Sequence, residues 1–183
     1  MNENIHNTRY ATTAIILHWL MALLLVGLFC GGLYMADLRL SPWKLKVYSW
    51  HKWAGVTAFI LVLARIVWRF AHHPPGLPSA MPRLLRFAAH AAHTLLYLLM
   101  VAVPLSGWLM SSAKGFQTVY FGVLPIPDLL AKDKELGNLL QDAHQALCFL
   151  LVGLVLGHLG AALKHHLIDR DDVLARMLPR RVR

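Results

Sequence analysis

The sequence predicts an all-α membrane protein built as a four-helix transmembrane bundle. Hydrophobic residues make up 57% of the 183 residues and charged residues only 15%, which argues against a soluble domain with a charged surface. Four apolar stretches each supply the roughly 20 helical residues that cross a bilayer. They lie near 11–36, 47–70, 87–111 and 139–163, and we expect one domain, 1–183, to contain them all.

The first stretch is predicted to be a transmembrane helix and not a cleaved signal peptide. It is longer than the apolar region of a signal peptide, and its N-terminal flank holds Arg9 as its one basic residue. No small-x-small cleavage site precedes the first loop. The membrane is therefore expected to hold this segment.

The basic residues predict the orientation of the bundle. With the N-terminus inside, the inner segments hold eleven Lys and Arg residues and the outer segments hold seven. Because inner loops carry the excess of positive charge, we expect a multi-pass protein of the bacterial inner membrane with both termini in the cytoplasm. The net charge of +9 then reflects topology and contact with anionic membrane lipid. No nucleic-acid partner is expected, since no soluble basic domain is predicted.

The histidines differ in their expected depth in the membrane. His6, His72 and His73 fall in a tail and a proline-rich loop, where solvated side chains are expected. His144 and His158 lie inside the last span, fourteen residues apart. Fourteen residues turn a helix by about 1400°, about 40° short of four full turns, and advance it by roughly 21 Å. The two rings therefore project from nearly the same face, one near each side of the hydrocarbon.

Depth also indicates which histidines can pair with these two. His51 lies near the outer end of the second span and is the one histidine at the depth of His144. Near the inner side, the candidates beside His158 are His18, His90 and His93. His18 has the most apolar surroundings, where an imidazole without a partner is costly. Spacing alone leaves the inner pair open.

Two histidine pairs at two depths form the ligand set for two haems stacked across the bilayer. Facing helices of a bundle can supply two axial imidazoles to each iron. With both axial positions filled, no site remains for oxygen, so the predicted chemistry is electron transfer. The chain has no C-x-x-C-H motif, and the haems are therefore expected to be non-covalent.

Two other interpretations of these histidines compete with haem ligation. Interhelical hydrogen bonding explains a single membrane histidine well, but it explains four at matched depths less well. A metal transporter would gather acidic or histidine ligands at one site near the midplane. Here the candidates avoid the middle, and the spans offer almost no carboxylates.

Arg65 and several glycines are further candidates for the haem environment. Arg65 lies fourteen residues after His51, on the same face and at the inner depth. Its guanidinium can pair with a haem propionate, or it can serve as an ordinary positive anchor at the inner interface. The glycines that would admit a flat macrocycle, or equally a neighbouring helix, are Gly27, Gly31, Gly55, Gly153 and Gly157.

Four ordered motifs cover nearly the whole chain. They are LHWLMALLLVGLF, WHKWAGVTAFILVLARIVWRF, HAAHTLLYLLMVAVPLSGWLMSS and DAHQALCFLLVGLVLGHLGAALKHHLIDRDDVLARMLP. This set resembles the bacterial two-haem cytochrome b561 family, of the type that oxidises superoxide and reduces ubiquinone. Other membrane cytochromes b, which serve hydrogenases and formate dehydrogenases, share the bundle and a similar histidine layout.

The resemblance implies specific roles for five histidines. It implies that His18 and His158 bind one haem b, and that His51 and His144 bind the other. It also implies a ubiquinone site at the cytoplasmic end of the fourth helix, where His165 matches a residue that contacts the quinone. His165 lies seven residues beyond His158, two turns on and near the same face. An interfacial histidine without a quinone is the alternative for this position.

Superoxide is the electron donor that the resemblance implies. The outer segments hold seven basic and five acidic residues, so a mildly positive outer surface would steer an anion. Lys52, next to His51, is the best candidate for guiding it.

The main alternative function is a cytochrome b subunit that carries electrons between quinone and a partner dehydrogenase or periplasmic cytochrome. The long connection 114–138, with its apolar VLPIP segment, is then the expected docking surface or lid.

Overall fold

The computed structural model describes residues 9–72, 75–76 and 81–178. His6 and His73, expected above in solvated segments, lie outside the described residues. The long helices are α1 (Thr12–Asp37), α2 (Pro42–Ala71), α3 (Arg83–Ala113) and α4 (Lys134–Lys164). Four helices of the described chain, the last counted through Asp169, are long and apolar enough to cross a membrane, which confirms the predicted fold class.

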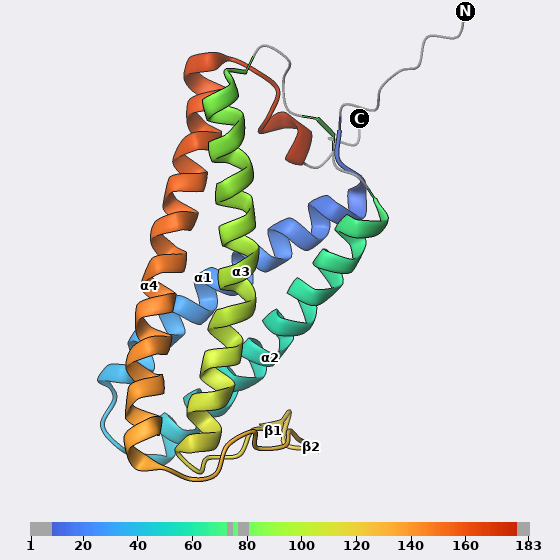
Figure 1. The fold of residues 1–183 in the computed structure, drawn as a ribbon. Coiled ribbons are helices and arrows are strands. Elements are labelled where there is room, and N and C mark those ends of the chain that lie inside the picture. The colour runs from blue at the N-terminus through green and yellow to red at the C-terminus, as the bar shows by residue number, and fades with distance from the viewer. Residues whose placement is uncertain (1–8, 73–74, 77–80, 179–183) are drawn as a thin grey trace, which may run out of the picture.

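The four helices form two pairs that lean apart toward one end (Figure 1). α3 runs beside α4 and α1 packs against α2, while α2 also contacts α3. The pairs lie close together at the end that carries β1 (Val119–Tyr120) and β2 (Leu124–Pro125). At the opposite end they diverge. There the short helix η1 (His165–Asp169) directly continues α4, and η2 (Ala175–Met177) lies between the two pairs.

Side-chain caps mark where two of the long helices, α2 and α4, begin. The Ser41 hydroxyl accepts a hydrogen bond from the Lys44 backbone amide, and Pro42 occupies the first turn of α2. The Asp133 carboxylate accepts from the Leu136 amide in the same way at the start of α4. Because of this cap, α4 begins earlier than expected, and residues 134–138 belong to the helix and not to the preceding loop.

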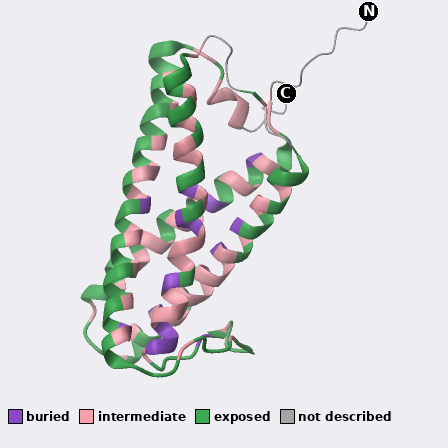
Figure 2. Ribbon diagram, viewed as in Figure 1, coloured by how far each residue is buried: buried purple, intermediate pink, exposed green. Residues whose placement is uncertain are grey.

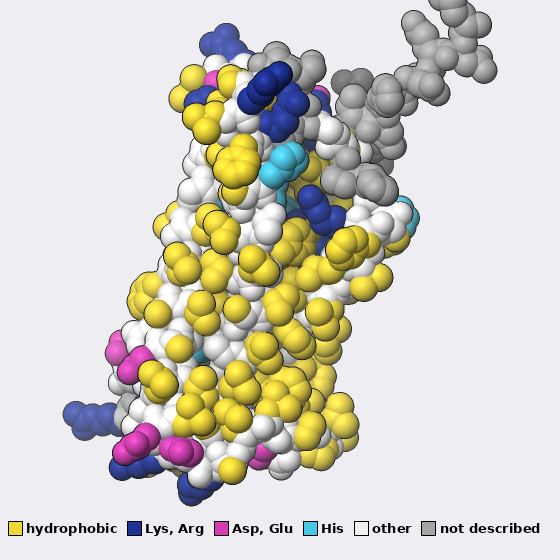
Figure 3. Space-filling view, in the orientation of Figure 1, with side chains coloured by type: hydrophobic (Ala, Val, Ile, Leu, Met, Phe, Trp, Pro, Cys, Tyr) yellow, Lys and Arg dark blue, Asp and Glu magenta, His cyan; other side chains and the backbone are white. Residues whose placement is uncertain are grey.

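One small apolar core joins all four helices at mid-height. Its buried members are Met21, Ala58, Val62, Leu96, Leu99, Met100 and Leu151. Elsewhere most long apolar side chains are exposed, and the few buried positions lie where helices face one another (Figure 2). Figure 3 shows the resulting surface, a broad hydrophobic band with Lys and Arg at its two ends. Such a surface suits contact with lipid.

A short hairpin covers α2 at the end where the helix pairs meet. β1 and β2 pair antiparallel, with Tyr120 opposite Leu124. Gly122 adopts a φ of 73° in its turn, and Gly115 adopts a φ of 72° just after the end of α3, a region that glycine enters without strain. The hairpin is bonded to α2, because Trp53 Nε1 donates to the Val119 carbonyl at 2.7 Å and the Thr57 hydroxyl lies 2.9 Å from that of Tyr120.

The C-terminal segment closes the opposite end of the bundle against α1. Trp19 Nε1 donates to the Met177 carbonyl at 2.8 Å. The Arg9 guanidinium donates to the carbonyls of Ala175 and Leu178 at 2.8 and 3.2 Å. The first and last described segments therefore meet at one end of the bundle, as an even number of spans requires. Which side of the membrane this end faces stays a prediction from the charge count.

Candidate functional site

A polar cluster lies between the helices on the side of the core nearer the C-terminal segment. α1 contributes His18, α2 contributes Arg65, α3 contributes His93 and α4 contributes His158. All four side chains are half-buried. Among the three histidines predicted as possible inner partners of His158, the structure brings His18 and His93 to it and leaves His90 exposed.

The ring separations in this inner cluster suit a metal ligand pair. The centroids of His18 and His158 are 6.2 Å apart, and those of His93 and His158 are 5.3 Å apart. Metal–imidazole bonds are about 2 Å long and a ring nitrogen lies about 1 Å from the ring centre, so two imidazoles on opposite sides of one metal ion have centroids roughly 6 Å apart. The His18–His158 distance is closer to this value, while His93 lies near enough to remain a competing ligand.

Arg65 holds His18 in one tautomer. Arg65 Nε donates to the Tyr97 hydroxyl at 3.0 Å, and its terminal NH₂ lies 3.0 Å from His18 Nδ1. Since arginine has no acceptor, His18 Nδ1 accepts this bond and a neutral ring carries its proton on Nε2. For His18 to bind iron, Arg65 must therefore release it. Sequence spacing placed Arg65 correctly at the inner depth but could not reveal that its partner is His18.

His144 is the histidine best prepared for metal binding. Its Nδ1 lies 3.1 Å from the Val103 carbonyl and 2.9 Å from the Ser106 hydroxyl. The Ser106 hydroxyl itself donates to the Val103 carbonyl at 2.7 Å, so Nδ1 is the donor to both oxygens. Metal-binding histidines commonly donate their second ring N–H to a carbonyl in this way, which leaves the other nitrogen free for the metal. Here Nε2 is that free nitrogen, with only the Cys148 thiol 3.7 Å away.

His51, on α2, lies at the same level of the bundle as His144 on α4. It is close enough to His144 to interact with it electrostatically. Its ring also approaches Gly32, where an added Cβ would lie 3.4 Å from His51 Cε1. A groove of about 310 Å³ opens beside it, lined by small and apolar residues of α1 and α2 that include Gly27, Gly31 and Ala54. The apolar lining and the lack of side chains at Gly27 and Gly31 fit a flat macrocycle. An added Cβ would meet nothing within 4 Å at any of the five candidate glycines, Gly27, Gly31, Gly55, Gly153 and Gly157.

The same fourteen-residue spacing recurs on all four helices. It separates His51 from Arg65 on α2 and His144 from His158 on α4. It also separates His18 from Gly32 on α1 and His93 from Gly107 on α3. A Cβ on Gly107 would lie 3.1 Å from His144 Cε1. Gly32 and Gly107 therefore leave space for the rings of His51 and His144. The sequence did not indicate this role, because glycines in apolar spans commonly serve helix packing instead.

Lys52 lies beneath the hairpin. Its ammonium donates to the Phe116 carbonyl at 2.7 Å and lies near the Asp128 carboxylate. Its side chain is half-buried, so the predicted guide residue is a tethered cation at the outer end of α2. Two of its three N–H donors remain for other acceptors.

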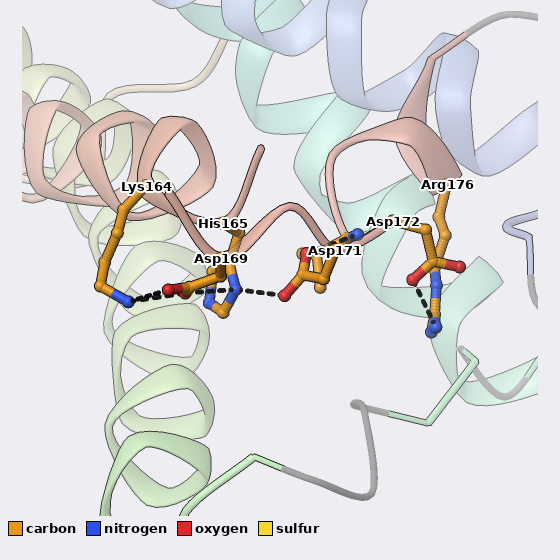
Figure 4. Close-up of polar contacts among 7 residues, drawn as sticks. Lys164, His165, Asp169, Asp171, Asp172 and Arg176 are labelled. Carbon is orange, nitrogen blue, oxygen red and sulfur yellow. Dashed lines mark hydrogen bonds and ion pairs between the residues drawn. The ribbon is translucent and has the colours of Figure 1, made fainter. Parts of the chain in front are cut away.

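A second polar cluster follows α4 in the π-helix η1 (Figure 4). His165 Nδ1 lies 2.6 Å from Asp171 Oδ2 and 3.3 Å from Asp169 Oδ2. The Lys164 ammonium contacts both oxygens of Asp169, at 2.6 and 2.7 Å. The two carboxylates beside His165 were not among the predicted site residues. The segment KHHLIDRDD carries the signal, because three aspartates follow the histidine within seven residues.

Asp172 belongs to a separate ion pair. Its carboxylate lies 2.8 Å from the Arg176 guanidinium, and the hydrogen bond from Arg176 holds the pKa of Asp172 below its usual value. Arg176 also donates to the Gly76 carbonyl at 2.9 Å. This pair therefore connects the C-terminal segment to the loop between α2 and α3.

The bundle with its two levels of histidines defines a membrane electron-transfer protein of the cytochrome b class. Residues 9–180 match the family model described as prokaryotic cytochrome b561. The chain belongs to this family, whose members hold b-type haem and transfer electrons within the membrane.

Three relatives extend over almost the entire chain. Cytochrome b561 homolog 2 of Escherichia coli (strain K12) is 38% identical over 172 residues, which cover 93% of this chain and 91% of the relative. Cytochrome b561 homolog 1 of the same organism is 28% identical over 182 residues, or 94% and 98% of the two chains. The probable superoxide oxidase CybB of Yersinia pestis is 28% identical over 180 residues, or 94% and 97%.

Proposed function

We propose that this protein oxidises superoxide on the periplasmic side of the inner membrane and passes the electrons through two b haems to ubiquinone. The observation that carries the proposal is the pair of histidine clusters on opposite sides of one apolar core. Both clusters draw on helices that face one another, as two axial ligand pairs require.

Four histidines of the chain would hold the haems. His51 and His144 would bind the outer one, and the Val103 carbonyl and Ser106 hydroxyl support this role by orienting His144. His18 and His158 would bind the inner one, supported by their 6.2 Å ring separation. Released from His18, Arg65 would be available to pair with a propionate. When bound, bis-histidine haems supply reversible one-electron chemistry.

Ubiquinone is the acceptor that the family resemblance favours, at His165. This residue lies just beyond the last turn of α4, where the helix continues as η1 and where Asp171 of the C-terminal segment contacts it. Ubiquinone takes up two electrons and two protons when it becomes ubiquinol. An imidazole at the cytoplasmic interface can deliver a proton near neutral pH.

Superoxide is the proposed donor because a relative carries the name probable superoxide oxidase. Two superoxide ions give up one electron each and leave as molecular oxygen, which supplies both electrons for one ubiquinone. Lys52 would attract the anion toward His51 with the N–H donors that Phe116 does not use.

The test is to mix purified, haem-loaded protein with a superoxide source and a short-chain ubiquinone. We expect ubiquinol to form, superoxide dismutase to abolish its formation, and His144→Ala to lack the activity. The His165→Ala variant should keep both haems, accept electrons normally and pass them to ubiquinone about tenfold more slowly. If superoxide never reduces the parent protein but a copurifying redox partner does, the protein is an electron-transfer subunit.

A further inference from the structure

The contact between His165 and Asp171 carries an inference that rests on the proposed function of His165. We propose that Asp171 is a positioning residue for quinone reduction. By accepting the Nδ1 hydrogen of His165, it makes Nε2 the nitrogen that meets ubiquinone and gives up the proton.

Asp171 is itself held rigidly. Its Oδ1 accepts a hydrogen bond from the Val173 backbone amide at 3.0 Å, while Oδ2 lies 2.6 Å from His165 Nδ1. The Asp171 backbone amide also donates to the His165 carbonyl at 3.1 Å. Arg170 between them adopts the left-handed conformation at φ 53°, which turns the chain back toward His165. The carboxylate and the imidazole are thus fixed by both backbone and side-chain bonds.

Asp169 is a weaker partner for the same ring. Its contact with His165 is longer, at 3.3 Å, and its two oxygens already receive the Lys164 ammonium. Lys164 is therefore the cation that balances Asp169, whereas His165 is the closest ion-pair partner of Asp171. The next charged groups along the segment, Asp172 and Arg176, pair with each other.

The chemistry follows from the two ring nitrogens. A carboxylate can only accept a hydrogen bond from an imidazole, so the proton between His165 and Asp171 stays on Nδ1. A carboxylate in this position also stabilises the imidazolium form, in which Nε2 carries a second proton. That proton can move to the reduced quinone: the Nε2–H bond breaks, its electron pair stays on Nε2, and an O–H bond forms on a quinone oxygen.

After the transfer, the ring is neutral with its proton on Nδ1, which is the tautomer that Asp171 favours. Nε2 then takes up a new proton from cytoplasmic water, ready for the second transfer. Both electrons come from the electron-transfer function of the protein. Asp171 is neither consumed nor protonated, and it acts only through His165.

The same three groups, His165, Asp169 and Asp171, lie close enough to share a metal ion. The Lys164 ammonium argues against this use, because it occupies both oxygens of Asp169. A chelator distinguishes metal binding from the positioning of His165. If these residues bind a metal, treatment with the chelator should have the same effect as the loss of Asp171.

The test compares Asp171→Asn with Asp172→Asn in the haem-loaded protein. Asp172→Asn is the matched control, since it removes an adjacent carboxylate that pairs with Arg176 and does not touch His165. We expect Asp171→Asn to keep both haems and their rate of reduction, and to slow reoxidation by ubiquinone about tenfold at neutral pH. Asp171→Glu should restore part of the rate, and Asp172→Asn should match the parent.

A second readout reports the tautomer independently of activity. In protein labelled with ¹⁵N-histidine, the His165 signals, identified by their loss in His165→Ala, should show protonated Nδ1 in the parent and a mixture of tautomers in Asp171→Asn. An unchanged tautomer together with an unchanged reoxidation rate overturns the inference. The quinone function survives that result as long as His165→Ala is slow. If His165→Ala reoxidises at the parent rate, the proposed quinone site and the inference both fail. A chelator that slows the parent to the Asp171→Asn rate overturns the inference in favour of a metal.

Discussion

His144 donates its Nδ1 hydrogen to two oxygens of α3, whereas His18 accepts a bond at Nδ1 from Arg65. The two proposed ligands therefore differ in whether Nε2 is available to bind a metal. His144 already offers Nε2 to a metal, while His18 must lose Arg65 and shift its proton first. We infer that the outer site is the more preorganised of the two.

Single ligand substitutions should each remove one haem. We expect His51→Ala and His144→Ala to lose the outer haem and keep the inner one, because each macrocycle has its own histidine pair. His18→Ala and His158→Ala should do the reverse. Low-temperature visible spectra and haem counts on the purified variants check this. If His93→Ala removes the inner haem and His18→Ala leaves its bis-histidine spectrum intact, His93 is the ligand.

Gly107 gives a second test at this scale. A valine there would push against His144, whose Cε1 would lie 3.1 Å from the new Cβ. We expect Gly107→Val to lower the occupancy of the outer haem severalfold and leave the inner haem in place. The control is Gly160→Val, since nothing lies within 4 Å of a Cβ at that position. Equal haem content in the two variants would contradict the role assigned to Gly107.

At this scale, the sequence predicts positions better than contacts. The fourteen-residue spacing placed Arg65 beside the inner histidines, as the structure finds. One of the two partners of His144 Nδ1 is the Val103 backbone carbonyl, a group that any residue would supply and that the sequence therefore does not signal. The contact between Asp171 and His165 depends on the left-handed turn at Arg170, and helical periodicity cannot predict such a turn.

Among the elements, the β1–β2 hairpin is the most informative. It lies within the long connection that was expected as a docking surface or lid, and it packs on α2 through side chains one helical turn apart, Trp53 and Thr57. Lys52 adds a third bond, to the Phe116 carbonyl. The hairpin therefore covers the outer end of α2 near His51. Periodicity predicted the four helices because lipid demands long apolar runs, but a two-residue strand pair leaves no such pattern.

Loosening the hairpin should be measurable without any assay of activity. We expect the double variant Trp53→Phe/Tyr120→Phe to lose two hydrogen bonds, each worth about 1 kcal/mol. Backbone amide exchange over residues 115–127 should then rise by roughly tenfold or more. Trp43→Phe is the control, since Trp43 bonds to the Tyr34 hydroxyl away from the hairpin. Identical exchange in the double variant and the control would show that these bonds do not hold the hairpin.

At the level of the whole molecule, one apolar core separates two polar levels. On α4 the sequence of positions is regular, with His144, Leu151, His158 and His165 each seven residues apart. Leu151 belongs to the buried core, and the outer and inner histidines lie two turns to either side of it. This register predicts two separate cofactor sites along one helix, with His165 as a third proposed functional position at the C-terminal end of that helix.

Two non-covalent haems per chain are the expected stoichiometry. Acid acetone should extract both, because no C-x-x-C-H motif is present to attach them. Pyridine haemochrome analysis of fully loaded protein, with protein measured by amino-acid analysis, counts them. One haem per chain would leave one histidine level without its proposed cofactor, and a colourless protein would contradict the proposed function as a whole.

The closure of the bundle by its C-terminal segment also sets an order of events during synthesis. Arg9 and Trp19 are synthesised before their partners Ala175, Leu178 and Met177, which lie 158 to 169 residues further along the chain. Until the C-terminal segment has been made, this end of the bundle cannot form these contacts, and we expect the polar cluster around His18 and His158 to be more accessible from it. We therefore expect the proposed haem at His18 and His158 to enter most easily before the C-terminal segment closes this end of the bundle.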